Sequence, residues 1–407
     1  MTKKSDAPAI RFKGFSDAWE QRKLGDMMNV TSVKRIHQSD WTDSGVRFLR
    51  ARDIVAAAKN EEPDDYLYIS KEKYEEYSAL SGKVGVSDLL VTGVGTIGVP
   101  YLVRNLEPLY FKDGNIIWFQ NSDKIDGKFL FYSFSAEQIQ GFINESAGIG
   151  TVGTYTIESG KKTPISLPNQ IEQAKVGEFF QQLDNLITLH QRKFEKLTNV
   201  KKSMLEKMFP QNGSSYPKIR FKGFTDPWEQ RKLGEIGSVS MCRRIFKEQT
   251  SETGDIPFYK IGTFGADPDA FISRELFEEY KSKYPYPQKG DILISASGSI
   301  GRTVEFAGNN EYFQDSNIVW LNHDERLSNP FLKCFYSVVK WAGIEGSTIK
   351  RLYNDNILNT VICMPSVPEQ KRIGLFFENL DNLITLHQRE LEKLQNIKKS
   401  MLEKMFV

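Results

Sequence analysis

The sequence predicts an α+β fold in which two mixed α/β domains are joined by two long antiparallel coiled-coil helices with pseudo-two-fold symmetry. Three observations support this prediction. The chain repeats itself, each repeat ends in a long stretch with helical apolar spacing, and the middle of each repeat carries short apolar runs typical of strands.

The duplication is clearest at the two ends of each repeat. The stretch IRFKGFSDAWEQRKLGD from Ile10 returns from Ile219 with 14 of 17 residues identical. LDNLITLHQRKFEKLTNVKKSMLEKMF from Leu183 returns from Leu380 with 23 of 27 identical. The middles have diverged, but scattered glycines and one strand-like run, FKDGNIIWF or FQDSNIVWL, still correspond. One fold therefore carries two different sequences.

Each repeat is expected to end in one long helix, at 169–209 and 366–407. Apolar residues there alternate in steps of four and three, which is typical of a coiled coil. The capping-box patterns Asn169-x-x-Glu172 and Ser366-x-x-Glu369 mark the starts, with the glutamates expected to cap, and Pro210 ends the first helix. At ~1.5 Å per residue, such a helix is too long to serve one small domain, so the other copy is its expected partner. The alternative is two separate helices, each packed on its own domain.

The coiled-coil seam is expected to bind partner helices. Its residues are Leu183, Ile187, Phe194, Leu197 and Met204, repeated as Leu380, Ile384, Leu391, Leu394 and Met401.

The remaining chain is expected to form a first domain at 1–168, a polar linker at 210–218 and a second domain at 219–365. Strands are expected at 88–92, 115–119, 291–295 and 317–321, and helices at 128–139 and 329–341.

No sequence motif indicates catalysis or a metal site. The run Gly93 to Gly98 matches G-x-G-x-x-G, but a β-type run follows, so we interpret it as a hairpin and not a cofactor loop. The three cysteines lack paired spacing, which favours a reducing cytoplasm over disulfides or zinc. The sequence shows no signal peptide and no apolar run of membrane-spanning length. We expect no catalytic residue, no metal and no cofactor in this chain.

Basic residues recur at matching places in the two middles, although the net charge of +2 is too small to indicate a partner. Arginine can hold either a guanine edge or a phosphate, whereas the alternative is a solvated charged surface. The residues expected to bind DNA are Lys34, Arg35, Arg50, Arg52, Thr96, Thr151, Thr154, Tyr155, Arg243, Arg244, Lys260, Ser297, Ser299, Lys350 and Arg351.

This order of duplicated ends, divergent middles and long helices resembles the specificity subunits of type I restriction-modification enzymes. The loop Gly346-Ser-Thr-Ile-Lys-Arg-Leu and the turns Leu167-Pro and Met364-Pro also match that layout, over essentially the whole chain. The first copy departs from it where Gly150-Thr-Val-Gly-Thr replaces the loop pattern.

The resemblance implies that each middle is a target-recognition domain that reads one half of a bipartite site in double-stranded DNA. It also implies that the helices set the spacer and dock two methyltransferase (M) subunits, and that restriction (R) subunits join them. S-adenosylmethionine, Mg and ATP would then belong to the partners. The alternatives are a non-enzymatic coiled-coil scaffold with two ligand- or protein-binding modules and, last, a cryptic nuclease or methyltransferase.

Overall fold

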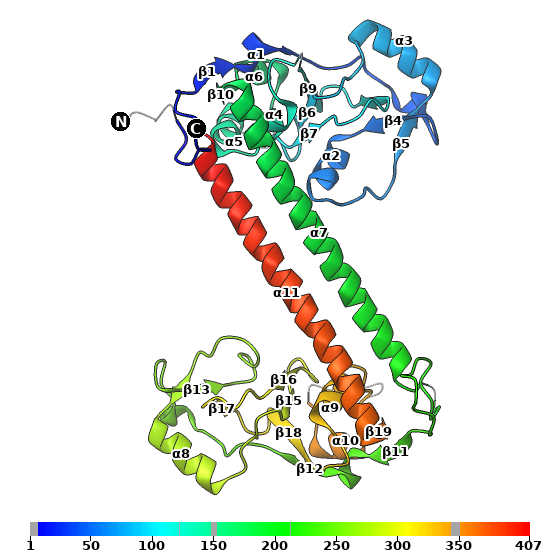
Figure 1. Cartoon of the computed structure of the whole chain (residues 1–407), viewed down its shortest axis with the longest axis vertical. Coiled ribbons are helices and arrows are strands. Elements are labelled where there is room, and N and C mark those ends of the chain that lie inside the picture. Colours follow the sequence, from blue (N-terminus) through cyan, green and yellow to red (C-terminus); the bar gives the residue numbers. More distant parts are fainter. Residues whose placement is uncertain (1–6, 122, 148–152, 212, 343–350) are drawn as a thin grey trace. The chain divides into compact units, whose positions relative to one another are not determined.

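A computed structural model describes residues 7–121, 123–147, 153–211, 213–342 and 351–407. The chain divides into two compact units (Figure 1). The first contains Met1–Arg192 together with Gln388–Val407, and the second contains Lys193–His387. Each unit therefore takes helical segments from both copies of the sequence repeat.

The first unit is built on two four-stranded sheets and a two-stranded ribbon. One sheet is antiparallel, in the order β2 (Asn29–Thr31), β9 (Ile116–Gln120), β6 (Leu89–Thr92) and β7 (Pro100–Leu102). The other has the order β3 (Trp41–Thr42), β5 (Leu67–Ile69), β4 (Val46–Leu49) and β8 (Leu109–Phe111), with β4 and β8 parallel. The ribbon pairs β1 (Glu20–Lys23) with β10 (Pro164–Leu167). The helices are α1 (Leu24–Met27), α2 (Ala51–Ala58), α3 (Lys71–Ser81), α4 (Gly127–Ser133), α5 (Glu137–Ser146) and α6 (Ile157–Lys162), with a 3-10 turn at Gln38–Asp40.

The second unit repeats this plan. Its antiparallel sheet has the order β12 (Gly237–Ser240), β18 (Ile318–His323), β15 (Ile292–Ser295) and β16 (Thr303–Glu305). A second sheet has the order β14 (Phe271–Ile272), β13 (Ile256–Tyr259) and β17 (Tyr312–Phe313), and the ribbon pairs β11 (Glu229–Lys232) with β19 (Val361–Met364). The helices are α8 (Arg274–Lys283), α9 (Asn329–Tyr336) and α10 (Asn354–Asn359), with 3-10 turns at Leu233–Glu235 and Lys247–Gln249. One architecture has therefore accommodated both divergent middles.

The central strand of each antiparallel sheet lies between two hydrophobic cores. Successive side chains of a strand point to opposite faces. In β9, Ile117 and Phe119 pack in the core beside the long helices, whereas Ile116 and Trp118 pack in a second core around β4 and β8. Strand β18 divides its side chains in the same way. Burial on both faces explains why these strands read as continuous apolar runs.

Helices α7 (Gln170–Met208) and α11 (Val367–Met405) pack together within each unit. The start of α7 meets the end of α11 in the first unit, and the end of α7 meets the start of α11 in the second. In the first unit, Phe406 follows the end of α11 and packs 5.7 Å from Phe180 of α7, measured between ring centroids. Asp184 of α7 is also bonded to Lys398 of α11 at 2.6 Å. In the second unit, Lys201 of α7 pairs with Asp381 of α11. The helices therefore run antiparallel, and the alternative of two separate helices is wrong.

The expected elements differ from the observed ones mainly at their ends. Both long helices begin one residue later than expected. The helix expected at 128–139 is two helices, because Ala136 takes an extended conformation before α5. The helix expected at 329–341 ends at Tyr336.

The capping boxes also differ from expectation. Asn169 Oδ1 accepts the backbone N–H of Glu172, as a helix cap does. The carboxylates of Glu172 and Glu369, however, bind Arg11 and Arg220 instead of turning back to the cap. The expected capping role of these glutamates is therefore wrong, because the repeated opening segment docks on each helix start.

Candidate nucleic-acid interface

A tight hairpin stands at the same place in both domains. In the first, Thr92 Oγ1 donates to the carbonyl of Thr96 at 2.6 Å and accepts from the Val99 N–H at 2.9 Å. Ser295 makes the equivalent bonds in the second domain. Strand β7 follows and pairs with β6, so the glycine motif forms a hairpin, as predicted. Thr96 and Ser299 lie exposed at the two tips.

In the second domain, a turn at Asp315–Asn317 gathers three of the residues expected to bind DNA. Arg244 Nε donates to Asp315 Oδ2 at 2.9 Å, and Arg351 Nη2 donates to the Ser316 carbonyl at 3.0 Å. Ser297 Oγ lies 2.8 Å from Asn317 Oδ1, to which it donates. The hairpin, the turn and the segment at Arg351 therefore present their polar groups together.

The first domain brings the corresponding elements together. Arg35 Nε donates to Asp113 Oδ2 at 2.9 Å. The N–H of Gly93 in the hairpin bonds to the Asn115 carbonyl, and the Tyr155 N–H bonds to the Gly93 carbonyl. The same combination of turn, hairpin and returning segment thus carries Arg35 in this domain.

Tyr155 does not belong to this surface. Its side chain is 2% exposed, packs in the core and shares a hydrogen bond with Thr163. Burial also raises the pKa of this phenol, which keeps it neutral. We therefore remove Tyr155 from the set, whereas Thr154 beside it is exposed. Thr151 and Lys350 lie outside the described residues.

The other basic residues of the set have different surroundings. Arg50 is mostly buried and bonds to Asp53 and Asp65, and Arg52 also pairs with Asp65. Lys34 is exposed. Lys260 pairs with Asp269 at 2.9 Å, and Arg243 lies over the Tyr284 ring at 5.1 Å. Arg50 therefore has the contacts of a structural residue.

The seam residues expected to bind partners are largely used inside the chain. Leu183 and Leu380 are buried in the cores of their units, and Ile187 is also buried. Leu197 and Met204 pack against the core of the second unit, and Leu394 and Met401 against that of the first. Phe194, Ile384 and Leu391 are half-buried.

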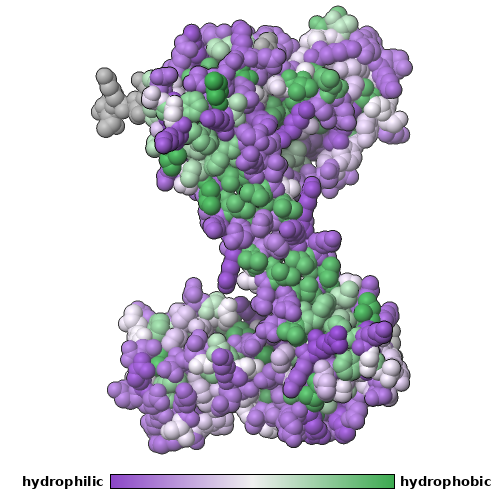
Figure 2. Space-filling view, viewed as in Figure 1, coloured by the Kyte–Doolittle hydropathy of each residue, from purple (hydrophilic) through white to green (hydrophobic). Residues whose placement is uncertain are grey.

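Other leucines of the helices remain exposed. Besides Leu375 on α11, they are Leu186 and Leu189 on α7 and their repeat equivalents Leu383 and Leu386 on α11. Figure 2 shows hydrophobic surface over the helices in this view. Sequence reasoning missed these positions because it assigned the apolar spacing to one seam.

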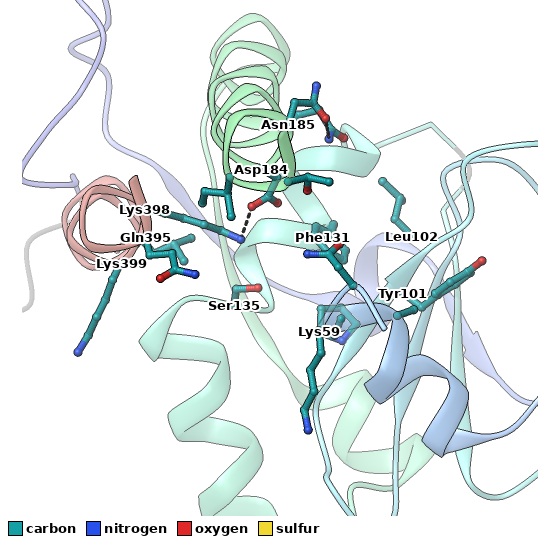
Figure 3. A pocket seen from close by; sticks show the side chains of 18 of the residues that line it. Lys59, Tyr101, Leu102, Phe131, Ser135, Asp184, Asn185, Gln395, Lys398 and Lys399 are labelled. Atoms are coloured by element: carbon teal, nitrogen blue, oxygen red, sulfur yellow. Dashed lines mark hydrogen bonds and ion pairs between the residues drawn. The ribbon is translucent and has the colours of Figure 1, made fainter. Parts of the chain in front are cut away.

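A cavity of about 1220 Å³ opens in the first unit between the first domain and the long helices (Figure 3). Its wall includes Lys59, Phe131 and Asn185, together with Asp184 and its ion-pair partner Lys398. Across the described ranges, no three or more His, Cys, Asp or Glu side chains are grouped as metal ligands. Within the same ranges, no helix has the length and apolar character to span a membrane.

A family model described as the type I restriction modification DNA specificity domain matches residues 16–199 and again 225–396. The chain belongs to this family. Each match covers one copy of the duplicated sequence, so the chain holds two specificity domains.

Individual members support this assignment. This specificity-domain chain is 61% identical over 158 residues to the putative type I restriction enzyme specificity subunit S.HindORF215P of Haemophilus influenzae. That match covers 38% of this chain and 41% of the relative, so it spans less than half of the relative's length. The putative type I restriction enzyme MjaX specificity subunit of Methanocaldococcus jannaschii is 24% identical to this chain. That match covers 94% of this chain and 92% of the length of the relative.

The fold is also shared with a solved structure. The S subunit of a type I restriction-modification system from M. genitalium superposes with a TM-score of 0.64 at 16% identity, over 98% of this chain and 99% of that one.

Proposed function

We propose that this chain is the DNA-recognition subunit of a type I restriction-modification enzyme, in which each domain reads one half of a bipartite site. One observation carries the proposal. Two domains of divergent sequence present a hairpin, an aspartate-bearing turn and an arginine in the same arrangement. Arginine and hydroxyl groups can contact phosphates and base edges.

The shared frame and the divergent middles suit different tasks. Two readers that differ in sequence can recognise two different half-sites, whereas nearly identical helices offer identical partners equivalent surfaces. We propose that the continuous helices α7 and α11 set the unread spacer between the half-sites. We also propose that the chain has no catalytic residue, and that S-adenosylmethionine, Mg and ATP are bound by partner subunits.

The partners are proposed to be two methyltransferase subunits, with restriction subunits joining them. Exposed leucines recur at equivalent places on the helices, at Leu186 and Leu189 and at Leu383 and Leu386. The buried core of a protein–protein interface is more apolar than its polar rim. Because the same exposed leucines occur once in each copy of the repeat, they suit two copies of one partner.

Methylation mapping tests the proposal. The chain is expressed with its methyltransferase partner in cells that otherwise lack adenine methylation, and the modified sites are sequenced. We expect one bipartite motif with a fixed unread spacer. Methylation without any motif, or assembly without sequence-selective DNA binding, would instead support the scaffold alternative.

A further inference from the structure

Two ion pairs have the same geometry in the two domains. Arg35 Nε lies 2.9 Å from Asp113 Oδ2, and Arg244 Nε lies 2.9 Å from Asp315 Oδ2. The arginine side chains are 66% and 60% exposed, whereas the aspartates are 13% and 15% exposed. In each case a largely buried carboxylate holds the inner edge of an exposed guanidinium group.

The backbone next to each arginine is also fixed in the same way. The Tyr110 hydroxyl donates to the Lys34 carbonyl at 2.8 Å, and the Tyr312 hydroxyl donates to the Arg243 carbonyl at 3.1 Å. Both tyrosines are buried, on strands β8 and β17, and each lies three residues before its aspartate. Each arginine is therefore restrained at its backbone and at Nε.

The outer edge of each guanidinium group remains available. Within the described ranges, Nη1 and Nη2 of Arg35 and Arg244 have no hydrogen-bond acceptor. A guanidinium group has five N–H donors, and the two Nη atoms carry four of them. These donors form a planar fork that matches a phosphate or a guanine edge.

Stability does not account for the shared pair. The cation of each pair is solvent-exposed, and a pair screened by solvent contributes about 0 to 1 kcal/mol. In the part of the chain described, the buried Oδ1 of Asp113 also lacks a hydrogen-bond partner, which is unfavourable for folding. The pair therefore restrains the arginine more than it stabilises the domain.

Neighbouring positions of the same surface differ between the domains. Gly93 corresponds to Ala296, Val94 to Ser297, and Val99 to Arg302. Residues that read different bases should differ in this way. The arginine and its aspartate are instead retained in both domains, which indicates contact with a part of DNA that every half-site has.

We propose that Arg35 and Arg244 are equivalent phosphate contacts, and that Asp113 and Asp315 are positioning residues that orient them. This inference rests on the proposed function, because it assigns roles within the same DNA-reading surface. Holding the side chain before binding reduces the rotamer entropy that the contact would otherwise lose. The phosphodiester backbone is the shared ligand, since it is present whatever the sequence.

The test measures the salt dependence of DNA binding by the full chain. One duplex contains the mapped target, and a second of equal length has both half-sites scrambled. Arg35→Ala and Arg244→Ala should each reduce the slope of log K against log salt by about 0.9, and should weaken both duplexes by the same factor. Arg35→Lys and Arg244→Lys should keep most of the slope, because lysine retains the charge.

Arg22→Ala is the matched control, because Arg22 is also exposed and paired with a carboxylate, Glu20, but lies in the β1–β10 ribbon. It should leave the slope unchanged. Thermal unfolding checks that every variant is folded. An affinity loss confined to the target duplex would make the arginines base readers, and unchanged slopes would place them on a solvated surface. Both results overturn the inference but leave DNA recognition intact, whereas an unmodified chain that binds neither duplex would contradict the proposed function itself.

A double-mutant cycle tests the positioning role. Asp113→Ala should weaken binding in the unmodified chain but not in the Arg35→Ala background, because there is then no side chain to orient. Asp315→Ala should behave likewise with Arg244→Ala. A general effect of removing a negative charge would be the same in both backgrounds, and that result would reject the positioning role.

Discussion

Arg11 and Glu172 are joined by two hydrogen bonds, of 2.8 and 2.6 Å, across 161 residues of sequence. Arg220 and Glu369 repeat the pair with two bonds of 2.7 Å. The carboxylates are 1% exposed, and the hydrogen bond to Glu172 raises the pKa of Arg11. The near-identity of the opening segments thus has a structural reason, since each ties the stretch before a ribbon strand to a helix start.

Replacing Glu172 with glutamine should destabilise the first unit by about 3 kcal/mol, because it leaves a largely buried guanidinium group without its counter-charge. Glu369→Gln should do the same to the second unit. Denaturant unfolding of the full chain measures the effect. Glu158→Gln, which breaks an exposed pair with Lys161, is the control and should cost less than about 1 kcal/mol. Equal effects for buried and exposed pairs would contradict the prediction.

Exchanging residues 30–160 for those of a relative should change one half-site and leave the other unchanged. The hairpin, the turn and the arginine of the first domain all lie in this range. Methylation mapping of the hybrid reads both half-sites at once. A simultaneous change of both would mean that the domains do not read independently.

The purified chain alone should show neither methyl transfer nor DNA cleavage, and methyl transfer should require a separate modification subunit. The sequence has no motif for either reaction. Incorporation of labelled methyl groups from S-adenosylmethionine, with and without the partner, measures this. Robust transfer by the chain alone would place catalysis in residues not recognised so far.

Changing the exposed leucines Leu186 and Leu189 to serine, together with Leu383 and Leu386, should weaken assembly with the methyltransferase subunit at least tenfold. The substitutions remove apolar surface that is already exposed in the chain, so its own unfolding should change little. Sedimentation of the mixed subunits measures assembly. Leu80→Ser is the control, since Leu80 is also exposed but lies on α3. Undiminished assembly would place the docking surface elsewhere.

A heptad inserted after Leu197 and another after Leu394 should lengthen the unread spacer while both half-sites keep their sequences. Seven residues keep the apolar seam on one face and add about 10 Å of helix, roughly three base-pair steps. Insertions of two residues should turn the seam by about 200° and disrupt assembly. Methylation mapping gives the spacer. An active double-heptad variant with an unchanged spacer would show that something other than the helices sets it.

The sequence predicts those features that depend on local pattern or on the repeat. The long helices, the hairpin at Gly93 and the strands around 116–120 and 318–323 all follow from periodicity or from corresponding runs. The roles of Asp113 and Asp315 do not, because each meets an arginine 78 or 71 residues away. The matching FKDGN and FQDSN runs were the available signal.

Tyr155 shows a second limit of prediction from sequence. Its glycine- and threonine-rich surroundings predict an exposed loop, but its N–H bonds to Gly93 and its ring enters the core. A local sequence cannot reveal such tertiary pairing.

The inclusion of residues 388–407 in the first unit has a consequence for biosynthesis. Met405 belongs to the core of that unit, and the Phe406 ring packs against Trp19 and Phe129. When the first domain has emerged from the ribosome, the segment that completes its core has not yet been made. That core stays incomplete until residue 406 has emerged as well. Domains usually fold in order as they are made, but here the unit begun first cannot close before the second has been translated.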